Sequence, residues 1–390
     1  MLQIPFSRGC SKLFSGEISM SSTLDWINLS LVPGLGLSGF WRLVEHFQSP
    51  GEVLRASGKD LAGVKGIRKR QISGLSTTTE LRHQGEIELE RLRLLGGMAI
   101  SFADDRYPLL LRQLVDPPPV LYILGRDHLL LQPAVAVVGS RAATSYGKRT
   151  AFNLCRKLVD WSVSVISGLA LGIDTESHKG ALAGQGSTVA VLGCGLDVVY
   201  PRQNRALYQR IAEDGVLVSE YPLGTKPEGF RFPARNRIIA GLSLGVIVVE
   251  AAKRSGSLIT AQMALDYGRE VFAVPGQVDS VKSEGTHWLL QQGAKLVQRV
   301  EDIVVELDLS GAGRKTDVAG LSQKPELEME PDAEILLTHV EPYPLMREEI
   351  LKKSGFAPAR LSELLLLLEL DGLIEMLPGD KVRKISGEGD

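Results

Sequence analysis

Short apolar runs alternate with helical patterns over the middle of this 390-residue chain. The runs 134–138 and 163–166 each end in a glycine-containing turn that leads into a helical pattern. A strand without polar alternation is buried on both faces, which is typical of a parallel sheet covered by helices. We therefore expect an α/β fold with a doubly wound parallel sheet. Strands are expected at 99–102, 120–124, 134–138, 163–166, 188–192, 216–219, 246–250, 270–274 and 294–297.

The carboxyl ends of these expected strands are rich in small residues. In a doubly wound sheet such ends share one edge, where ligands bind. Small residues let a ligand approach the backbone, and the N–H groups at the start of each following helix attract phosphate. Arg141 adds a guanidinium suited to bidentate phosphate contact. The predicted phosphate-binding edge comprises Gly139, Ser140, Arg141, Ser167, Gly168, Ala170 and Gly193, with a third anion nest at Ser255, Gly256 and Ser257.

Arginine and phenylalanine alternate in the stretch 230–237, near the start of an expected helix. Guanidinium groups and aromatic rings together hold single-stranded nucleic acid, because they contact phosphates and stack on bases. The alternative is that the phenylalanines are core residues and the arginines pair with carboxylates such as Glu220. The candidate contacts are Arg141, Arg202, Phe232, Arg235 and Arg237.

Several catalytic patterns are missing or out of context. No GxxxxGK[ST] occurs, and the first strand is not followed by GxGxxG. Residues 241–245 match GxSxG, but an expected helix precedes them and a strand follows, the reverse of a nucleophile elbow around Ser243. Asp174 and His178 could form an acid/base pair, or could cap their helix and orient neighbours. We expect no catalytic residue, no metal and no cofactor.

Composition is ordinary for a globular protein, with 44% hydrophobic and 23% charged residues. The net charge of -2 gives no global sign of nucleic-acid binding, although a local basic patch remains compatible with it. Three isolated cysteines and six scattered histidines form no disulfide or zinc pattern, which favours a cytoplasmic location. No apolar run reaches the length of a membrane span. Residues 1–22 lack the apolar core of a signal peptide and are expected to be a disordered tail, with Met20 a candidate start.

The remaining chain suggests flanking domains. Residues 23–98 are expected to be helical, and the turns 31–36 and 61–67 resemble those of a helix-hairpin-helix or SAM-like module, in which turn amides hold a DNA phosphate. The alternative is that both turns serve packing alone. Lys65, Arg68, Lys69 and Arg70 favour phosphate at the second turn.

The sheet domain is expected at 99–309 and a linker at 310–331, where large apolar residues are few. Residues 332–387 are expected to form a winged helix, with three helices and a hairpin. Its third helix, 358–371, exposes an acidic face, which is a poor match for a phosphate backbone. We interpret this domain as a protein-contact or regulatory module, with DNA contact through the hairpin as the lesser option.

A set of consecutive motifs over about residues 99–307 closely resembles the DNA-processing protein A family (DprA, also called Smf). The resemblance implies a Rossmann-like protein that binds and protects single-stranded DNA and loads RecA recombinase in natural transformation. It also implies a homodimer that is not an enzyme. The motifs are SRAATSYG, SGLALGID, HKGAL, VLGCGLDVVYP, SEYPLG, FRFPARNRIIAGLS, VVEAAKRSGSLITA and VFAVPG.

Individual family positions can be located in this sequence. The DNA-contact arginine after the first strand corresponds to Arg141, and the basic residue of the Tyr-Pro-basic-x-Asn motif corresponds to Arg202, where other members have lysine. The fold also resembles nucleotide-releasing hydrolases of the lysine-decarboxylase-like group, which is the alternative function. Their PGGxGTxxE signature is represented here by residues 254–260, without its paired glycines or catalytic glutamate. The FPxRN motif corresponds to Phe232, Pro233, Arg235 and Asn236.

Overall fold

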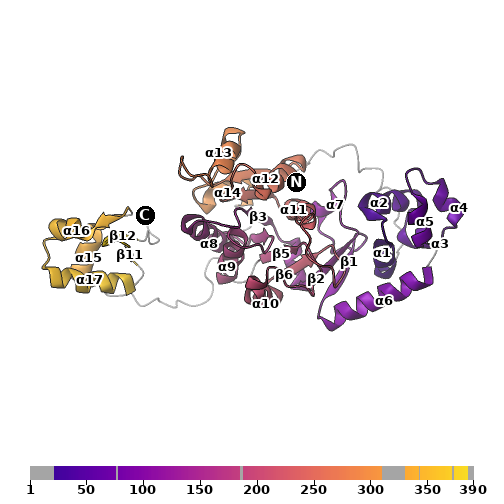
Figure 1. Ribbon diagram of the computed structural model, residues 1–390, viewed down its shortest axis with the longest axis horizontal. Helices are drawn as coiled ribbons and strands as arrows, with labels where there is room; N and C mark the ends of the chain where they lie inside the picture. Colours follow the sequence, from indigo (N-terminus) through magenta and orange to yellow (C-terminus); the bar gives the residue numbers. More distant parts are fainter. Residues whose placement is uncertain are drawn as a thin grey trace. The chain divides into compact units, whose positions relative to one another are not determined.

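The computed structural model describes residues 22–75, 78–184, 188–309, 330–341, 343–370 and 373–384. The chain divides into two compact units, residues 1–316 and 317–390 (Figure 1). The expected tail, apart from Ser22, and the expected linker, apart from residues 330 and 331, lie outside the described residues.

Nine strands of the described chain form one sheet in the order β1-β2-β6-β5-β4-β3-β7-β8-β9. The seven strands from β6 to β9 in this order are parallel, which confirms the doubly wound fold. The first two strands instead pair antiparallel at one edge, so the parallel sheet carries a hairpin-like extension. The strands are β1 (Met98–Ser101), β2 (Val120–Gly125), β3 (Ala134–Val138), β4 (Ser164–Ser167), β5 (Thr188–Leu192), β6 (Val216–Ser219), β7 (Gly245–Val248), β8 (Glu270–Ala273) and β9 (Lys295–Leu296).

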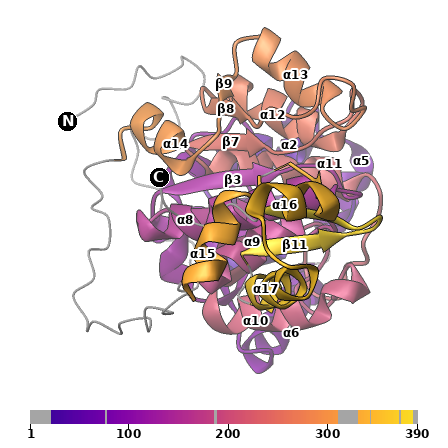
Figure 2. The ribbon, with the colours of Figure 1, turned by 90° about the vertical axis from the view of Figure 1, so that its left-hand side faces the viewer.

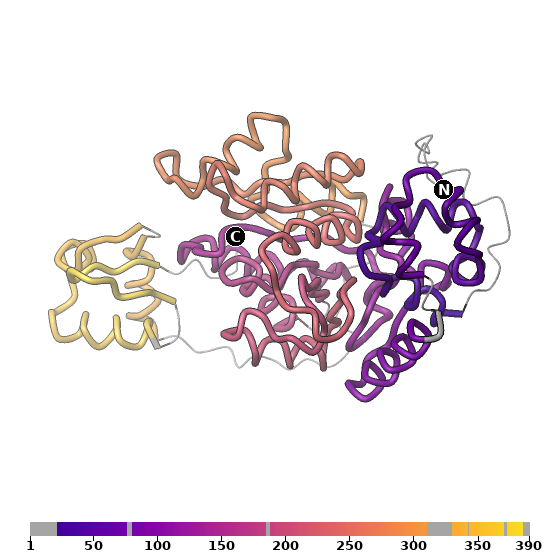
Figure 3. Tube along the Cα trace, turned by 45° about the vertical axis from the view of Figure 1, so that its right-hand side comes forward, coloured from indigo at the N-terminus to yellow at the C-terminus, as the bar shows by residue number. Residues whose placement is uncertain are grey.

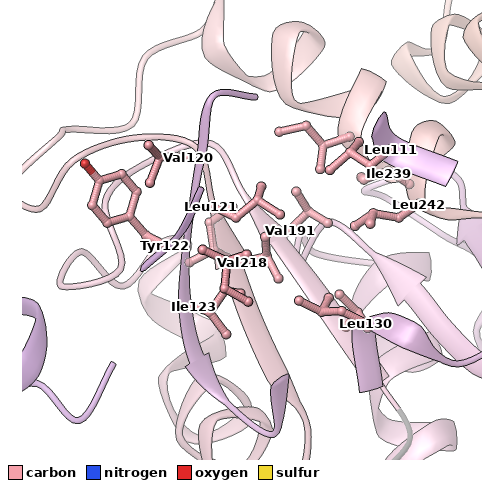
Figure 4. Packing of buried hydrophobic residues seen from close by; sticks show 14 of the residues in the cluster. Leu111, Val120, Leu121, Tyr122, Ile123, Leu130, Val191, Val218, Ile239 and Leu242 are labelled. Carbon is pink, nitrogen blue, oxygen red and sulfur yellow. The ribbon is translucent and has the colours of Figure 1, made fainter. Parts of the chain in front are cut away.

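Helices cover both faces of this sheet, as its unbroken apolar strands predict. In β3, Ala136 and Val138 join one buried cluster, whereas Val135 and Val137 join another on the opposite face. Figure 4 shows part of the first cluster, to which Val191 and Val218 of the sheet and Ile239 of a covering helix belong. The first face is covered by α11 (Arg231–Leu242) and α12 (Gly256–Asp266), which contact each other, and α13 (Glu284–Gln291) lies next to β8. The second face is covered by α8 (Ser145–Asp160), α9 (Ile173–Ala183) and α10 (Arg205–Asp214), each in contact with the next, together with α14 (Val300–Glu306).

The helical segment that precedes the sheet belongs to the same compact unit (Figure 3). Aromatic side chains of this segment pack against the start of the sheet, and the Trp41 and Phe102 rings lie 4.7 Å apart in an edge-to-face contact. Trp41 Nε1 also donates to the carbonyl of Pro117 at 2.8 Å, so the proline run accepts a hydrogen bond from the helices. The helices are α1 (Thr23–Ser30), α2 (Gly36–Phe47), α3 (Pro50–Arg55), α4 (Gly58–Gly63), α5 (Lys69–Leu75) and α6 (Thr78–Leu94), and the short α7 (Leu109–Arg112) follows β1.

The second unit has the three helices and the hairpin expected of a winged helix (Figure 2). The sequence predicts a helix over 345–353, and this prediction is wrong for the first two residues. Leu345 and Met346 instead pair with the hairpin as a third strand. Leu336, Leu364 and Val382 are fully buried in a core shared by the helices and the sheet. The elements are α15 (Pro331–Thr338), β10 (Leu345–Met346), α16 (Arg347–Ser354), α17 (Pro358–Leu370), β11 (Ile374–Leu377) and β12 (Lys381–Lys384), with strand order β10-β12-β11.

Candidate functional site

A cavity of about 60 Å³ lies at the carboxyl edge of the sheet, above β3, β4 and β5. We call it the sheet-edge pocket. Segments that are far apart in the sequence line it, because parallel strands bring their following loops to one edge. Six of the predicted site residues meet here, namely Arg141, Gly168, Ala170, Gly193, Phe232 and Arg235, and they are joined by Leu171, Leu192, Cys194, Tyr200 and Pro201.

An aromatic platform forms one side of the pocket. The Phe232 ring at the start of α11 stacks with Tyr200, with centroids 5.4 Å apart. The exposed Arg141 guanidinium lies over the same ring at 5.4 Å from its centroid. A Cβ at Gly193 would come within 2.9 Å of Phe232 Cδ1, so glycine lets the ring sit against the strand end. Tyr200 was missed by the sequence reasoning, although its place before Pro201 in the Tyr-Pro-basic motif was a usable signal.

Arg235 supplies a buried positive charge to the pocket. Its side chain is 4% exposed, and Nη1 donates to the carbonyls of Gly168, at 2.8 Å, and Val191. Among the described residues, no carboxylate lies within ion-pair distance of it. Burial lowers the pKa of Arg235 to about 10, although the Asp174 carboxylate acts in the opposite direction. A Cβ on Gly168 would overlap this guanidinium, so glycine is required there.

Two backbone amides after β4 that were expected to face a ligand are instead used inside the fold. The N–H groups of Gly168 and Ala170 both donate to Asp174 Oδ2, at 3.1 and 3.3 Å. Burial raises the pKa of Asp174, while Arg235 and these amides favour its charged form. Asn204 Nδ2 donates to the carbonyl of Leu169 at 2.9 Å from the other side. The start of this loop is therefore held by side chains of the fold, and the Gly168 and Ala170 amides are not available to a ligand.

His178 completes this support and is fully buried. Its Nε2 accepts from the Leu169 N–H at 3.3 Å, and its Nδ1 lies 2.7 Å from Thr188 Oγ1, which itself donates to the carbonyl of Val165. We assign the neutral tautomer with the proton on Nδ1, because Thr188 has already used its own hydrogen. Burial lowers the pKa of His178 to about 3. Both ring nitrogens are engaged inside the fold, which supports the orienting role rather than the acid/base role.

The first loop also builds the floor rather than lining the pocket. The Ser140 N–H donates to the carbonyl of Glu250 at 2.8 Å, and the Ser140 carbonyl accepts from the Ile173 N–H at 3.2 Å. Gly139 packs against Ile173 and leaves no room for a Cβ. Ser167 Oγ is buried and donates to the carbonyl of Val137 at 2.7 Å. These predicted site residues position the loop that carries Arg141.

Arg237 requires a correction, since the structure does not bring it to the pocket. Its side chain is buried, and its guanidinium pairs with the Glu220 carboxylate and donates to the carbonyl of Asp116 at 2.8 Å. Burial raises the pKa of Glu220, and Arg237 opposes that shift. The alternative that an arginine of this stretch pairs with Glu220 therefore holds for Arg237. Phe232 and Arg235 instead line the pocket.

The other predicted residues lie outside the pocket lining. Arg202 is exposed next to Pro201, and Asn236 Oδ1 accepts from Arg235 Nε at 3.3 Å. Ser255 caps α12 by accepting from the Ser257 N–H, with Gly256 between them, and it lines a different cavity of about 650 Å³ bordered by α12 and α13. That third nest is thus not part of the sheet-edge pocket.

Chemical groups for catalysis are scarce at this site. Ser243 is fully buried and donates to the carbonyl of Ile239. No carboxylate lines the sheet-edge pocket. Within the described ranges, no three His, Cys, Asp or Glu side chains come together in a way that could hold a metal ion. None of the helices in those ranges combines the length and apolarity of a membrane span.

Comparison with protein families finds two matches along this chain. The model for DNA recombination-mediator protein A matches residues 98–308, and the model for the DprA winged helix domain matches residues 322–380. Protein Smf of Synechocystis is 34% identical over an alignment 390 residues long, and the aligned regions cover 92% of this chain and 98% of that protein. Protein Smf of Escherichia coli is 42% identical over 286 residues, covering 71% and 75% of the two chains.

Two solved structures are similar in both fold and sequence. The X-ray structure of DNA processing protein A from Streptococcus pneumoniae has a TM-score of 0.65 and 38% identity, covering 73% of this chain and 98% of that one. A structure that concerns the single-stranded DNA binding mode of DNA processing protein A from Helicobacter pylori has a TM-score of 0.51 and 32% identity. The matched region covers 55% of this chain and 96% of the Helicobacter pylori chain.

Proposed function

This chain belongs to the DNA recombination-mediator protein A family, and from that membership we propose that its sheet-edge pocket binds single-stranded DNA. The observation that carries the proposal is the buried Arg235 guanidinium, which has carbonyl partners but no ion-pair partner among the described residues. Asp174 favours the charged form of Arg235 without forming an ion pair with it, and a buried charge that lacks such a partner is costly. An anion bound above Arg235 would offset that cost. The pocket is therefore suited to a phosphate.

The surroundings of that charge favour a nucleotide polymer over an isolated anion. Arg141 is exposed beside the pocket and can contact a second phosphate. Phe232 and Tyr200 present a stacked aromatic pair on which bases can lie. A phosphate-contacting cation beside a stacking surface is the arrangement used to hold single strands, and stacking contributes ~1–3 kcal/mol per base.

The dimensions of the pocket indicate how a strand is held. A cavity of about 60 Å³ accommodates a few water-sized groups, and so a phosphoryl group rather than a complete nucleotide. The rest of the strand then lies across the edge of the sheet. Because phosphates and ring faces are common to every nucleotide, we expect weak sequence preference and strong dependence on salt.

The biological role that we propose is broader than the site. The relative from Helicobacter pylori is described as binding single-stranded DNA, which supports the same ligand here. We further propose that the protein protects DNA in natural transformation and recombination, loads RecA recombinase, acts as a homodimer, is not an enzyme and resides in the cytoplasm. These proposals rest on the family resemblance.

The decisive experiment is a titration of Arg141→Ala with labelled oligo-dT at two or more salt concentrations. We expect weaker binding and a log–log salt slope that is smaller by about 0.7, since one phosphate contact is lost. The matched control is Arg126→Ala, which removes an exposed arginine that pairs with Asp214 outside the pocket and changes the net charge equally.

Equal effects of the two substitutions would overturn the assignment of the site. Incubation with nucleoside monophosphates, followed by a search for released base, tests the hydrolase alternative. Because no carboxylate lines the pocket, we expect no release.

A further inference from the structure

A second basic surface lies far from the sheet-edge pocket in the sequence, on the hairpin formed by α4 and α5. Residues 61–75 contain four cationic side chains and no acidic one, although the whole chain has a net charge of -2. Lys65, Arg68, Lys69 and Arg70 are all exposed. The charge on this hairpin is therefore local and faces solvent.

A fifth cation comes from a different helix. Gly66 has a φ of +87°, and a Cβ placed on it would overlap the guanidinium of Arg42 from α2. Arg42 thus lies directly against the hairpin turn, in the space that a side chain at position 66 would take. We call the five residues, Arg42, Lys65, Arg68, Lys69 and Arg70, the basic hairpin surface.

These five side chains are not neutralised by carboxylates. None of them lies within ion-pair distance of an acidic side chain in the part of the chain that the structure describes. Exposed arginines on neighbouring helices behave differently, since Arg55 of α3 pairs with Glu52 at 2.6 Å and Arg93 of α6 pairs with Glu90 at 2.9 Å. The basic hairpin surface is therefore available to an external anion.

The backbone that carries the surface is held in place. Gln71 Nε2 donates to the carbonyls of Gly34 and Leu35 at 3.1 and 3.0 Å, which ties this hairpin to the preceding one. Gln71 Oε1 accepts from the Arg68 N–H at 2.7 Å. The cations are thus presented from a preorganised frame, which lowers the entropic cost of binding.

We propose that the basic hairpin surface binds the phosphate backbone of duplex DNA, as a site separate from the sheet-edge pocket. Duplex DNA carries one charge per ~1.7 Å of its axis, so neighbouring phosphates can reach several of the five cations together. Single-strand sites need aromatic platforms, but no Phe, Tyr or Trp in the described part of 22–75 is exposed. The surface therefore fits a backbone whose bases are already stacked on one another.

The test is a titration of the full chain with a blunt-ended duplex over a range of salt concentrations. The variant Arg68→Gln/Lys69→Gln/Arg70→Gln removes three cations whose side chains are exposed. We expect its log–log salt slope to be smaller by about 2.7, at ~0.9 per phosphate contact. Over a fourfold rise in salt, the wild-type affinity should then fall about 40-fold more than the affinity of the variant.

The matched control is Arg93→Gln/Lys157→Gln/Arg210→Gln, which removes the same charge from exposed positions on α6, α8 and α10. It should retain the wild-type slope. A hairpin variant that keeps the wild-type slope, or a control that loses as much, would overturn the proposal.

Binding of oligo-dT separates this inference from the proposed function. It should respond to Arg141→Ala and change much less in the hairpin variant. Failure at either site therefore leaves the result at the other interpretable. An acidic protein as the occupant would show as unchanged duplex binding, which would refute a DNA-binding role for the basic hairpin surface.

Discussion

The buried His178 makes the stability of the first unit depend on pH in a calculable way. Its pKa is lowered to about 3 by burial, against an ordinary value of 6.5. The folded protein thus binds fewer protons at this residue than the unfolded chain does. The resulting stabilisation is complete above pH 6.5 and is lost as the pH falls toward 3.

The size of the effect follows from this shift in pKa. Between pH 7 and pH 5 the unfolded histidine becomes protonated while the folded one remains neutral. The free energy of unfolding falls by ~1.4 kcal/mol for each pH unit over which the unfolded histidine is protonated and the folded one is not. The total loss is about 2 kcal/mol, because the unfolded histidine is mostly neutral above pH 6.5. His178→Gln removes this pH-dependent contribution while retaining an acceptor for the Leu169 N–H. At pH 7 we expect the variant to be less stable by ~1–3 kcal/mol, since a buried hydrogen bond is weakened.

Urea unfolding at pH 7, 6 and 5, followed by tryptophan fluorescence, provides the measurement. All four tryptophans of the chain precede residue 317, so the signal reports the first unit. The difference in unfolding free energy between wild type and variant should shrink by about 2 kcal/mol from pH 7 to pH 5. A difference that stays constant with pH would refute the neutral, buried state of His178.

Two further substitutions separate the pocket from the frame that supports it. Phe232→Ala should weaken oligo-dT binding by ~1–3 kcal/mol, because it removes a stacking surface, with a smaller effect on the melting temperature; unaltered affinity in a fluorescence titration would argue against the aromatic platform. Arg237→Ala should lower stability by ~3–5 kcal/mol, because it leaves the Glu220 carboxylate buried without its partner, and Arg237→Ala/Glu220→Gln should recover part of that loss. A large loss of oligo-dT affinity in the folded double variant would contradict the structural role of Arg237.

The strands and the general position of the site could be predicted from the sequence because they depend on local patterns. An unbroken apolar run such as 134–138 allows few environments other than a covered parallel strand. Arg141 follows that strand directly, so its position at the carboxyl edge follows from the topology of the sheet. Phe232 was found because aromatic and guanidinium side chains alternate around it.

Other features depended on contacts between distant segments. Gly168 and Ala170 looked available to phosphate, but Asp174 accepts hydrogen bonds from both of their amides. The composition of that loop does not show whether an amide donates to an internal carboxylate or has no hydrogen-bond partner within the fold. The distinction depends on how α9 packs against β4, which is a tertiary contact.

Arg235 and Arg237 show most clearly the difference between what local sequence determines and what tertiary contacts determine. Their spacing on α11 turns them to different sides of the helix, so at most one of them can face the pocket. The sequence by itself determined that two cations occupy this helix beside an aromatic residue. Only the tertiary structure decided that Arg237 meets Glu220 and that Arg235 lines the sheet-edge pocket. The carboxylate that follows β6 is a long-range neighbour of α11, which local sequence does not specify.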